Sequence, residues 1–194
     1  MTTSTLITPS PDTGPAHFLW GTTVLAARVE LDGIVRPAPR PRGELPDVVS
    51  DGTPCQQIPA GLVLTDEYAL TALFLEAMNA ACADASPVTE VDITVQVWRA
   101  GHGIPAEANP ADWIAWCYLT ATPAPSKAES GCLSLADPRP ASDQTAMPGL
   151  PWGRAIIVRP IAGNLVVAPG WLTTSVVPVE TGQNLIVAIA TSAR

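Results

Sequence analysis

Hydrophobic and polar residues alternate with a period of two through much of the second half of the chain. Residues 91–98 are the clearest case, with one aliphatic and one mixed face. The aliphatic face consists of Val91, Ile93, Val95 and Val97, and the mixed face consists of Asp92, Thr94, Gln96 and Trp98. Other short apolar segments, separated by turn-forming clusters, are residues 22–31, 113–121, 131–137, 155–160, 164–169, 175–179 and 184–190. Short strands at this spacing predict an antiparallel sandwich or barrel.

One segment, residues 66–85, follows a helical period instead. Its apolar side chains recur every three or four positions, at Leu70, Leu73, Phe74, Ala77, Met78 and Ala81. We expect Thr65 to cap this helix, and the acidic Asp66 and Glu67 suit its positive N-terminal end. The apolar stripe predicts a helix that lies against a sheet.

The composition favours one compact domain made of many short elements. The chain has 194 residues, of which 47% are hydrophobic and 14% charged, with 21 Pro and 14 Gly. We expect a single domain over residues 1–194. It would consist of an N-terminal strand and a Pro-rich connector in residues 1–60, a helix in residues 65–85 and a barrel core in residues 90–194.

The charge of the chain restricts its partners. A net charge of −8 argues against nucleic acid and against an anionic membrane surface. The basic, Pro-rich residues 36–43, with Arg36, Arg40 and Arg42, predict a solvated connector, and a role in partner contact stays open. We expect a cytoplasmic location, because the N-terminus has no signal-peptide pattern and no apolar run reaches the roughly 18 residues of a membrane span.

The reactive residue types form no familiar catalytic motif. The four cysteines, at positions 55, 82, 117 and 132, include no Cys-x-x-Cys pair, so we expect buried, reduced thiols and no zinc site. There is no Gly-x-Ser-x-Gly elbow and no phosphate-binding glycine loop. Asp137 and Arg139 predict a structural ion pair at the end of a strand.

Two motifs in the barrel region resemble those of a known enzyme family. They are "SGCLSLADPRP" in residues 130–140 and "VRPIAGNLVVAPGWLTTSVVP" in residues 158–178, and "FLWGTTVLAARVE" in residues 18–30 adds to them. The chain resembles the iron(II)- and 2-oxoglutarate-dependent oxygenases related to prolyl hydroxylases. This resemblance implies a mainly β fold, a double-stranded β-helix of the jelly-roll, cupin-like type, with one or two buttressing N-terminal helices.

The same resemblance places the family's binding residues at positions that are altered in this chain. The family holds iron with two His and one carboxylate. The stretch that would supply the first two ligands contains Glu107 and Asp112 but no His, and Thr173 and Thr174 stand where the last ligand would fall. Gln183 and Asn184 stand where an Arg would bind 2-oxoglutarate. We therefore expect no metal and no cofactor.

His102 has three interpretations. It can be a plain loop residue between two glycines. It can join Glu107 and His17 in an atypical iron site. It can also act as a general acid or base without any metal, because imidazole titrates near neutral pH. We rank the acid–base role above the iron site.

Aromatic side chains supply candidate binding surface. The strand parity places Trp98 opposite Val95 and Val97, and it points Trp113 and Trp116 to opposite faces, so at least one Trp is expected inside the barrel. With Trp171, Thr173, Thr174 and Asn184, these residues are predicted to bind a small apolar molecule.

Three functions follow as hypotheses. The preferred one is a metal-independent enzyme, with His102, Glu107 and Thr174 as catalytic residues, that promotes a cyclisation, rearrangement or isomerisation in bacterial secondary metabolism. The alternative is a non-catalytic structural or accessory protein, for example a phage virion component. The third is an oxygenase with atypical ligands. Formation of a homo-oligomer is left open, as are the substrate and the pathway.

Overall fold

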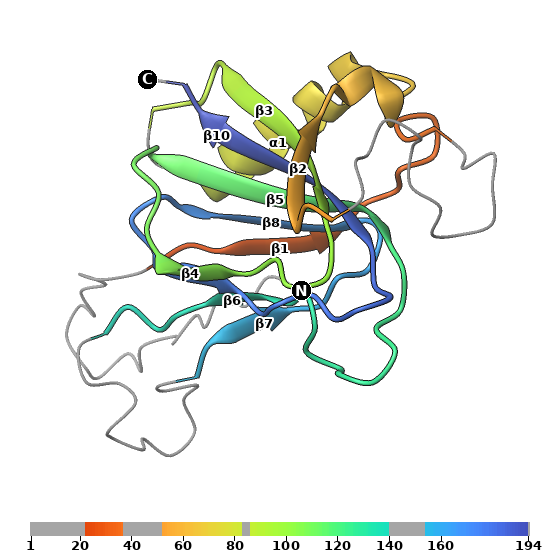
Figure 1. The fold of residues 1–194 in the computed structure, drawn as a ribbon. Helices are drawn as coiled ribbons and strands as arrows, with labels where there is room; N and C mark the ends of the chain where they lie inside the picture. The colour runs from red at the N-terminus through yellow and green to blue at the C-terminus, as the bar shows by residue number, and fades with distance from the viewer. Residues whose placement is uncertain (1–21, 37–51, 83–85, 140–153, 194) are drawn as a thin grey trace.

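The computed structural model describes residues 22–36, 52–82, 86–139 and 154–193 (Figure 1). His17 and most of the basic connector in residues 36–43 lie outside these ranges. The described part of the connector is Arg36, whose Nε donates a hydrogen bond to the Leu64 carbonyl oxygen at 3.0 Å.

Within the described residues, ten strands form two antiparallel sheets. The larger sheet has the order β1-β8-β5-β10-β3-β2, and the smaller sheet has the order β4-β9-β6-β7. The strands of the larger sheet are β1 (Leu25–Arg28), β2 (Cys55–Ile58), β3 (Val91–Trp98), β5 (Trp113–Ala121), β8 (Asn164–Pro169) and β10 (Leu185–Ser192). The strands of the smaller sheet are β4 (Ile104–Glu107), β6 (Leu133–Leu135), β7 (Ile156–Val158) and β9 (Thr174–Val176).

The connections identify the fold as a double-stranded β-helix. The chain passes from one sheet to the other at β3 to β4, β5 to β6, β7 to β8 and β9 to β10. The larger sheet contains the order β8-β5-β10-β3, and the smaller sheet, taken from its other edge, has the order β7-β6-β9-β4. Each strand in one sheet therefore faces the strand of the other sheet to which a single connection links it. The predicted fold class, a mainly β jelly-roll barrel, is confirmed.

The two ends of the barrel differ. All four of these connections lie at one end, which we call the closed end, beside Trp98, Ala121, Val158 and Val176. The other end, which we call the open end, contains the start of β3, the end of β4 and the start of β9. The segments that join β4 to β5 and β8 to β9 are hydrogen-bonded to each other at the open end.

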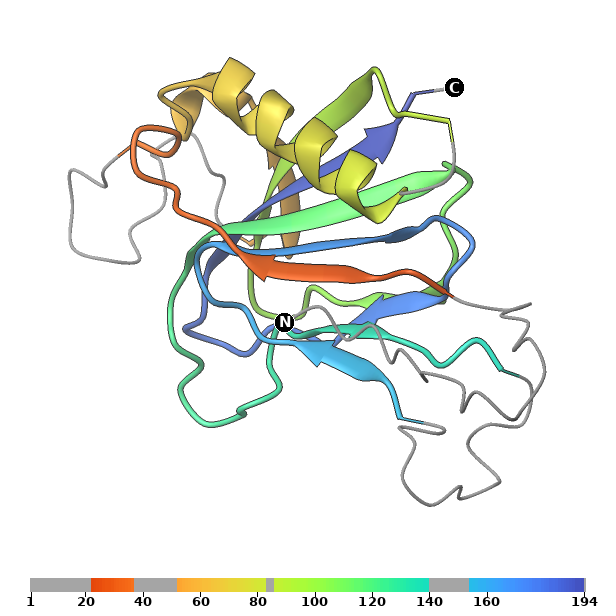
Figure 2. The same cartoon turned by 180° about the vertical axis from the view of Figure 1, so that it is seen from behind.

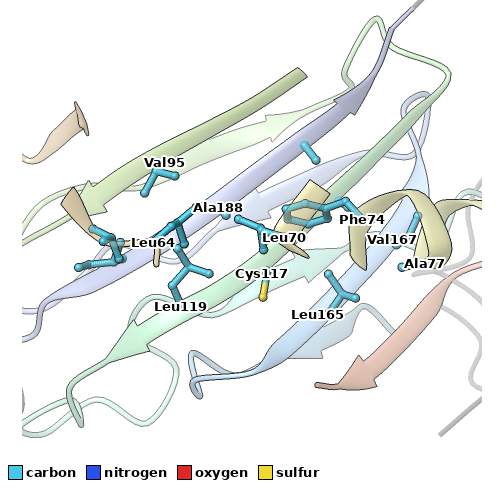
Figure 3. Packing of buried hydrophobic residues seen from close by; sticks show 14 of the residues in the cluster. Leu64, Leu70, Phe74, Ala77, Val95, Cys117, Leu119, Leu165, Val167 and Ala188 are labelled. Atoms are coloured by element: carbon cyan, nitrogen blue, oxygen red, sulfur yellow. The ribbon is translucent and has the colours of Figure 1, made fainter. Parts of the chain in front are cut away.

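The helix α1 (Glu67–Ala81) covers the outer face of the larger sheet (Figures 1 and 2). Its buried residues are those of the predicted stripe, with Leu73 only partly buried, and they pack on the outward side chains of the sheet, such as Cys117, Leu165 and Val167 (Figure 3). The predicted cap was wrong by one residue. Asp66 caps the helix, because its carboxylate accepts the Ala69 N–H at 2.9 Å. A short 3-10 turn, η1 (Ala60–Leu62), precedes the helix.

A second core fills the space between the two sheets. Trp98 and Trp116 belong to it, whereas Val95 and Val97 pack with the helix on the opposite face. Trp113 is partly buried against the helix-side core. The strand parities predicted from the sequence are therefore confirmed.

Two of the strands, β2 and β4, were not predicted from the sequence. β2 has the polar sequence Cys-Gln-Gln-Ile and lies at the edge of the larger sheet, where one-sided pairing tolerates polar residues. β4 is interrupted by an irregularity between Ile104 and Glu107, so its residues do not alternate. The other differences are shifted strand ends, such as residues 25–28 within the predicted 22–31 and residues 185–192 against the predicted 184–190.

The four cysteines are free thiols, three of them buried and Cys55 half-buried. Burial raises the pKa of the Cys117 thiol to about 12, which keeps it protonated and unreactive. Among the described residues, no helix has the length and apolar character that a membrane crossing requires.

Candidate binding site at the open end of the barrel

A row of four side chains crosses the smaller sheet at the open end. Glu107 pairs with Thr174, Thr174 pairs with Leu135, and Leu135 pairs with Ile156. Paired residues point to the same face of a sheet. Because Leu135 belongs to the core between the sheets, the whole row points to the inner face of the barrel.

A matching row crosses the larger sheet. Asp92 pairs with Thr191, Thr191 with Ile114, and Ile114 with Ala168. Ile114 and Ala168 belong to the core between the sheets, so this row also points inward. Asp92 and Thr191 were not among the sequence-predicted site residues. The alternation of β3 did place Asp92 on the face of Trp98, so a signal for it was present.

The two rows divide the open end into a polar half and an apolar half. The polar half is formed by the facing strand pairs β3/β4 and β10/β9, and it contains Asp92, Glu107, Thr191 and Thr174. The apolar half is formed by β5/β6 and β8/β7, and it contains Ile114, Leu135, Ala168 and Ile156.

Solvent reaches the inner surface at this end. Thr94, Ile189 and Thr191 are only partly buried, although their pairing places them on the inner face. Asp92 and Glu107 are exposed. In the apolar half, Ile156 has 46% of its surface exposed. A small molecule can therefore contact the polar half and Ile156 from the open end.

Thr174 is the most buried polar side chain of the two rows, with 8% of its surface exposed. Within the described part of the chain, its hydroxyl has no hydrogen-bond partner. The Thr174 oxygen is not one of the fully buried side-chain atoms that lack a partner among the described residues, so it keeps some accessible surface. A ligand that enters from the open end can therefore hydrogen-bond with it.

The segments that join β4 to β5 and β8 to β9 are tied together beside this row. The Asn109 N–H donates to the Gly170 carbonyl oxygen at 2.8 Å, and the Gly170 N–H donates to the Asp112 carbonyl oxygen at 2.9 Å. A Cβ on Gly170 would stand 1.8 Å from the Ala111 carbonyl oxygen, so only glycine fits there. These contacts fix the end of β4, with Glu107, relative to the start of β9, with Thr174.

His102 lies at the closed end, away from this site. Its ring packs against Trp98 with centroids 4.9 Å apart, and its backbone carbonyl accepts the Val179 N–H at 2.8 Å. β4 begins at Ile104, beside His102, and ends at Glu107. Three residues along a strand span about 10 Å, so Glu107 lies well away from His102. The structure thus brings Glu107 and Thr174 together and separates His102 from both.

The imidazole of His102 has a desolvated environment. Its Nε2 is buried with no hydrogen-bond partner among the described residues. Burial lowers the pKa of this imidazole below its ordinary value of 6.5, so it is neutral at pH 7. Together with its contact to Trp98, this supports a packing role.

Gln183 and Asn184, which stand where the resemblance expects a 2-oxoglutarate-binding Arg, make hydrogen bonds that hold the closed end together. The buried Gln183 side chain is hydrogen-bonded to the Ser130 hydroxyl and donates to the Thr122 carbonyl oxygen at 3.3 Å. The Asn184 backbone N–H donates to the Thr122 hydroxyl at 2.8 Å. Neither position offers a positive charge to a carboxylate.

The Glu180 side chain, between β9 and β10, is hydrogen-bonded to the segment that joins β5 to β6. These contacts predict that the protein loses stability in acid. The Glu180 carboxylate accepts the Ser126 hydroxyl and the N–H groups of Ser126 and Lys127, the latter two at 3.0 Å. The Ser126 hydroxyl, followed by these N–H groups, lowers the pKa of Glu180 below its ordinary value of 4.5. This stabilisation is present above pH 4.5 and is lost as the pH falls through the lowered pKa.

Urea unfolding of the parent and the Glu180→Gln variant, at about pH 7 and about pH 3, tests this expectation. We expect the parent to be the more stable protein at pH 7 and the difference to shrink at pH 3. A difference of equal size at both pH values would contradict it.

The remaining predicted site residues lie at the surface or serve structure. Trp171 has 57% of its surface exposed, and Thr173 is exposed beside it. Asp137 and Arg139 form the predicted ion pair just after β6, where the Arg139 Nε donates to Asp137 Oδ1 at 2.7 Å.

The side chains at the open end do not match the iron ligands of the oxygenase family that this chain resembles. Glu107 and Thr174, at the expected ligand positions, supply one carboxylate and one hydroxyl but no imidazole. Over the described ranges, no group of three or more His, Cys, Asp or Glu side chains is arranged to hold a metal ion.

Comparisons with known proteins find similarity at the level of fold. No family model matches the chain, and no curated protein does either. A crystal structure of a Pseudomonas putida prolyl-4-hydroxylase is 16% identical and has a TM-score of 0.46, with 63% of this chain and 61% of that chain covered. The α-ketoglutarate-dependent epimerase SnoN of nogalamycin biosynthesis is 17% identical over 53% of this chain and 46% of its own, with a TM-score of 0.37. The corresponding carbocyclase SnoK is 14% identical over 50% and 48%, with a TM-score of 0.34. This chain thus spans about three-fifths of the prolyl hydroxylase and about half of the other two.

Proposed function

We propose that this protein binds a small, largely apolar molecule at the open end of the barrel and promotes its cyclisation, rearrangement or isomerisation without iron or 2-oxoglutarate. The observation that carries the proposal is the pairing of Glu107 with Thr174 on the inner face, opposite Asp92 and Thr191 and beside an apolar half in which Ile156 is exposed. We further propose that the metal and cofactor sites of the resembling family have been lost from this chain.

The proposed chemistry needs no co-reactant. An isomerisation or cyclisation of this kind conserves both composition and oxidation state. The Glu107 carboxylate accepts a proton from one position of the ligand and returns it at another, and the Thr174 hydroxyl orients the group between them. The apolar half holds the rest of the ligand in one conformation, and such positioning contributes several kcal/mol to a unimolecular step.

The first test uses a neutral apolar probe, 4-phenylbutanol, with protein that has been treated with EDTA. We expect the amide NMR signals of Thr174, Ile189 and Thr191 to shift on titration, since these residues line the open end. Shifts confined to the outer face around α1 would refute the proposed binding site.

The roles of Glu107 and His102 separate once a substrate is found by screening neutral and charged apolar metabolites for turnover. Glu107→Gln is expected to lower kcat about 100-fold or more, because it removes the proton acceptor. His102→Phe is expected to keep kcat within about threefold of the parent, because that residue lies at the closed end. If a steady-state assay showed a large loss of kcat in His102→Phe and little change in Glu107→Gln, the assignment of Glu107 as the proton acceptor would be wrong.

A second candidate function, a structural component built from copies of this chain, is favoured by one observation. β7 ends the smaller sheet, and it carries the outward Ile157 with 52% of its surface exposed, close to Ile161 with 43% exposed. Light scattering separates the two functions. A monomer at tens of micromolar would argue against the structural component.

A further inference from the structure

We infer that the ligand of the open end carries a positive charge, as a protonated amine does, attached to an apolar body. This inference rests on the proposed binding site and names the class of molecule that fills it.

Carboxylates gather around the polar half of the open end. Asp92 and Glu107 lie on facing strands within it, and Glu90 and Asp112 lie just outside it, before β3 and β5. All four side chains are exposed, and within the described ranges none has an ion-pair partner.

The basic residues described at this end do not offset these charges. Arg139 is paired with Asp137, and Arg154 precedes β7 on the apolar side. Carboxylates around one opening create a negative potential that attracts cations and repels anions. An anionic ligand such as 2-oxoglutarate is therefore disfavoured at this opening.

A second and independent observation places a ligand group inside this half. Thr174 is more than nine-tenths buried and points inward beside Glu107, and its hydroxyl has no partner among the described residues. An ammonium group has three N–H donors. It can therefore donate to the Thr174 hydroxyl and to a carboxylate together, while its apolar body contacts the exposed Ile156 in the other half.

Three probes of equal length test the charge of the ligand: 4-phenylbutylamine, 4-phenylbutanol and 4-phenylbutanoate. At pH 7 they are a cation, a neutral molecule and an anion. We expect the amine to bind at least tenfold more tightly than the alcohol, and the carboxylate to bind least. Amide shifts of Thr174 and Thr191 would report the binding, and added salt is expected to weaken the amine selectively.

Charge-neutralising variants give the matched comparison. Glu107→Gln and Asp92→Asn should each weaken the amine about fivefold or more and leave the alcohol unchanged. Glu76→Gln removes one carboxylate from an exposed position on α1, on the outer face, so it should change neither affinity.

The outcomes distinguish this inference from the proposed function. If the alcohol binds at the open end as tightly as the amine, and Glu107→Gln changes neither, the inference falls while the proposed site stands. If none of the three probes shifts the Thr174 and Thr191 signals, both fall.

Discussion

Replacement of Trp98 by alanine is expected to lower the free energy of unfolding by about 4 kcal/mol, the largest effect of any substitution considered. Trp98 has none of its surface exposed and lies at the closed end of the barrel. Its indole Nε1 donates to Gln96 Oε1 at 2.8 Å, its ring meets Tyr118 edge-on at 6.3 Å, and the His102 ring covers it. Truncation would leave a cavity and remove the donor to Gln96 at the same time.

Urea unfolding followed by circular dichroism measures this loss. Trp171→Ala is the matched control, because it removes the same side chain from an exposed turn, and it should change stability by less than about 0.5 kcal/mol. Similar losses in the two variants would mean that Trp98 does not fill the barrel.

Gly170→Ala is expected to cost about 3 kcal/mol and also to weaken ligand binding. The added methyl group would stand 1.8 Å from the Ala111 carbonyl oxygen and within 3 Å of the Asn109 carbonyl oxygen, which are backbone atoms with little room to move. The segments that join β4 to β5 and β8 to β9 must then separate. Glu107 and Thr174, which flank them, lose their relative placement.

Gly61→Ala is the control for this second effect. A Cβ at Gly61 would come no closer than 3.4 Å to Glu67 Oε1, so the substitution should change stability by less than about 0.5 kcal/mol. Thermal unfolding and titration with 4-phenylbutanol report stability and binding separately. A Gly170→Ala protein with parental stability would contradict the close approach of the two segments.

The fold could be predicted from the sequence wherever local pattern and buried face agree. β3, β5 and β8 have the predicted bounds, because their alternation or apolar runs continue to both ends. The helix was found by its stripe, but its cap was placed at Thr65 when Asp66 takes that role. Both side chains suit an N-cap, and only the backbone of the first turn decides between them.

The site was predictable only in part, because it depends on pairing between distant strands. Thr174 and Glu107 were singled out separately by the resemblance. Their juxtaposition depends on the irregularity in β4, which shifts the parity so that Ile104 and Glu107 both point inward. His102 was grouped with Glu107 because it is near in sequence, yet β4 carries the chain from the closed to the open end between them.

Asp92 and Thr191 show what strand prediction alone does not give. Asp92 lies on a predicted strand and Thr191 lies just beyond the predicted residues 184–190, but the facing of β3 with β4 and of β10 with β9 arises only from the order of both sheets. The polar and apolar halves of the open end are thus a property of the topology and not of any single motif.

One calorimetric experiment tests the central claim most directly. Protein prepared without oxygen is titrated with iron(II) and then with 2-oxoglutarate, and its metal content is measured by elemental analysis. The account predicts neither stoichiometric iron nor binding heat for 2-oxoglutarate, because the open end offers one carboxylate and one hydroxyl at the expected ligand positions. One tightly bound iron per chain, lost in Glu107→Gln and followed by 2-oxoglutarate binding, would contradict the account and identify an oxygenase with atypical ligands.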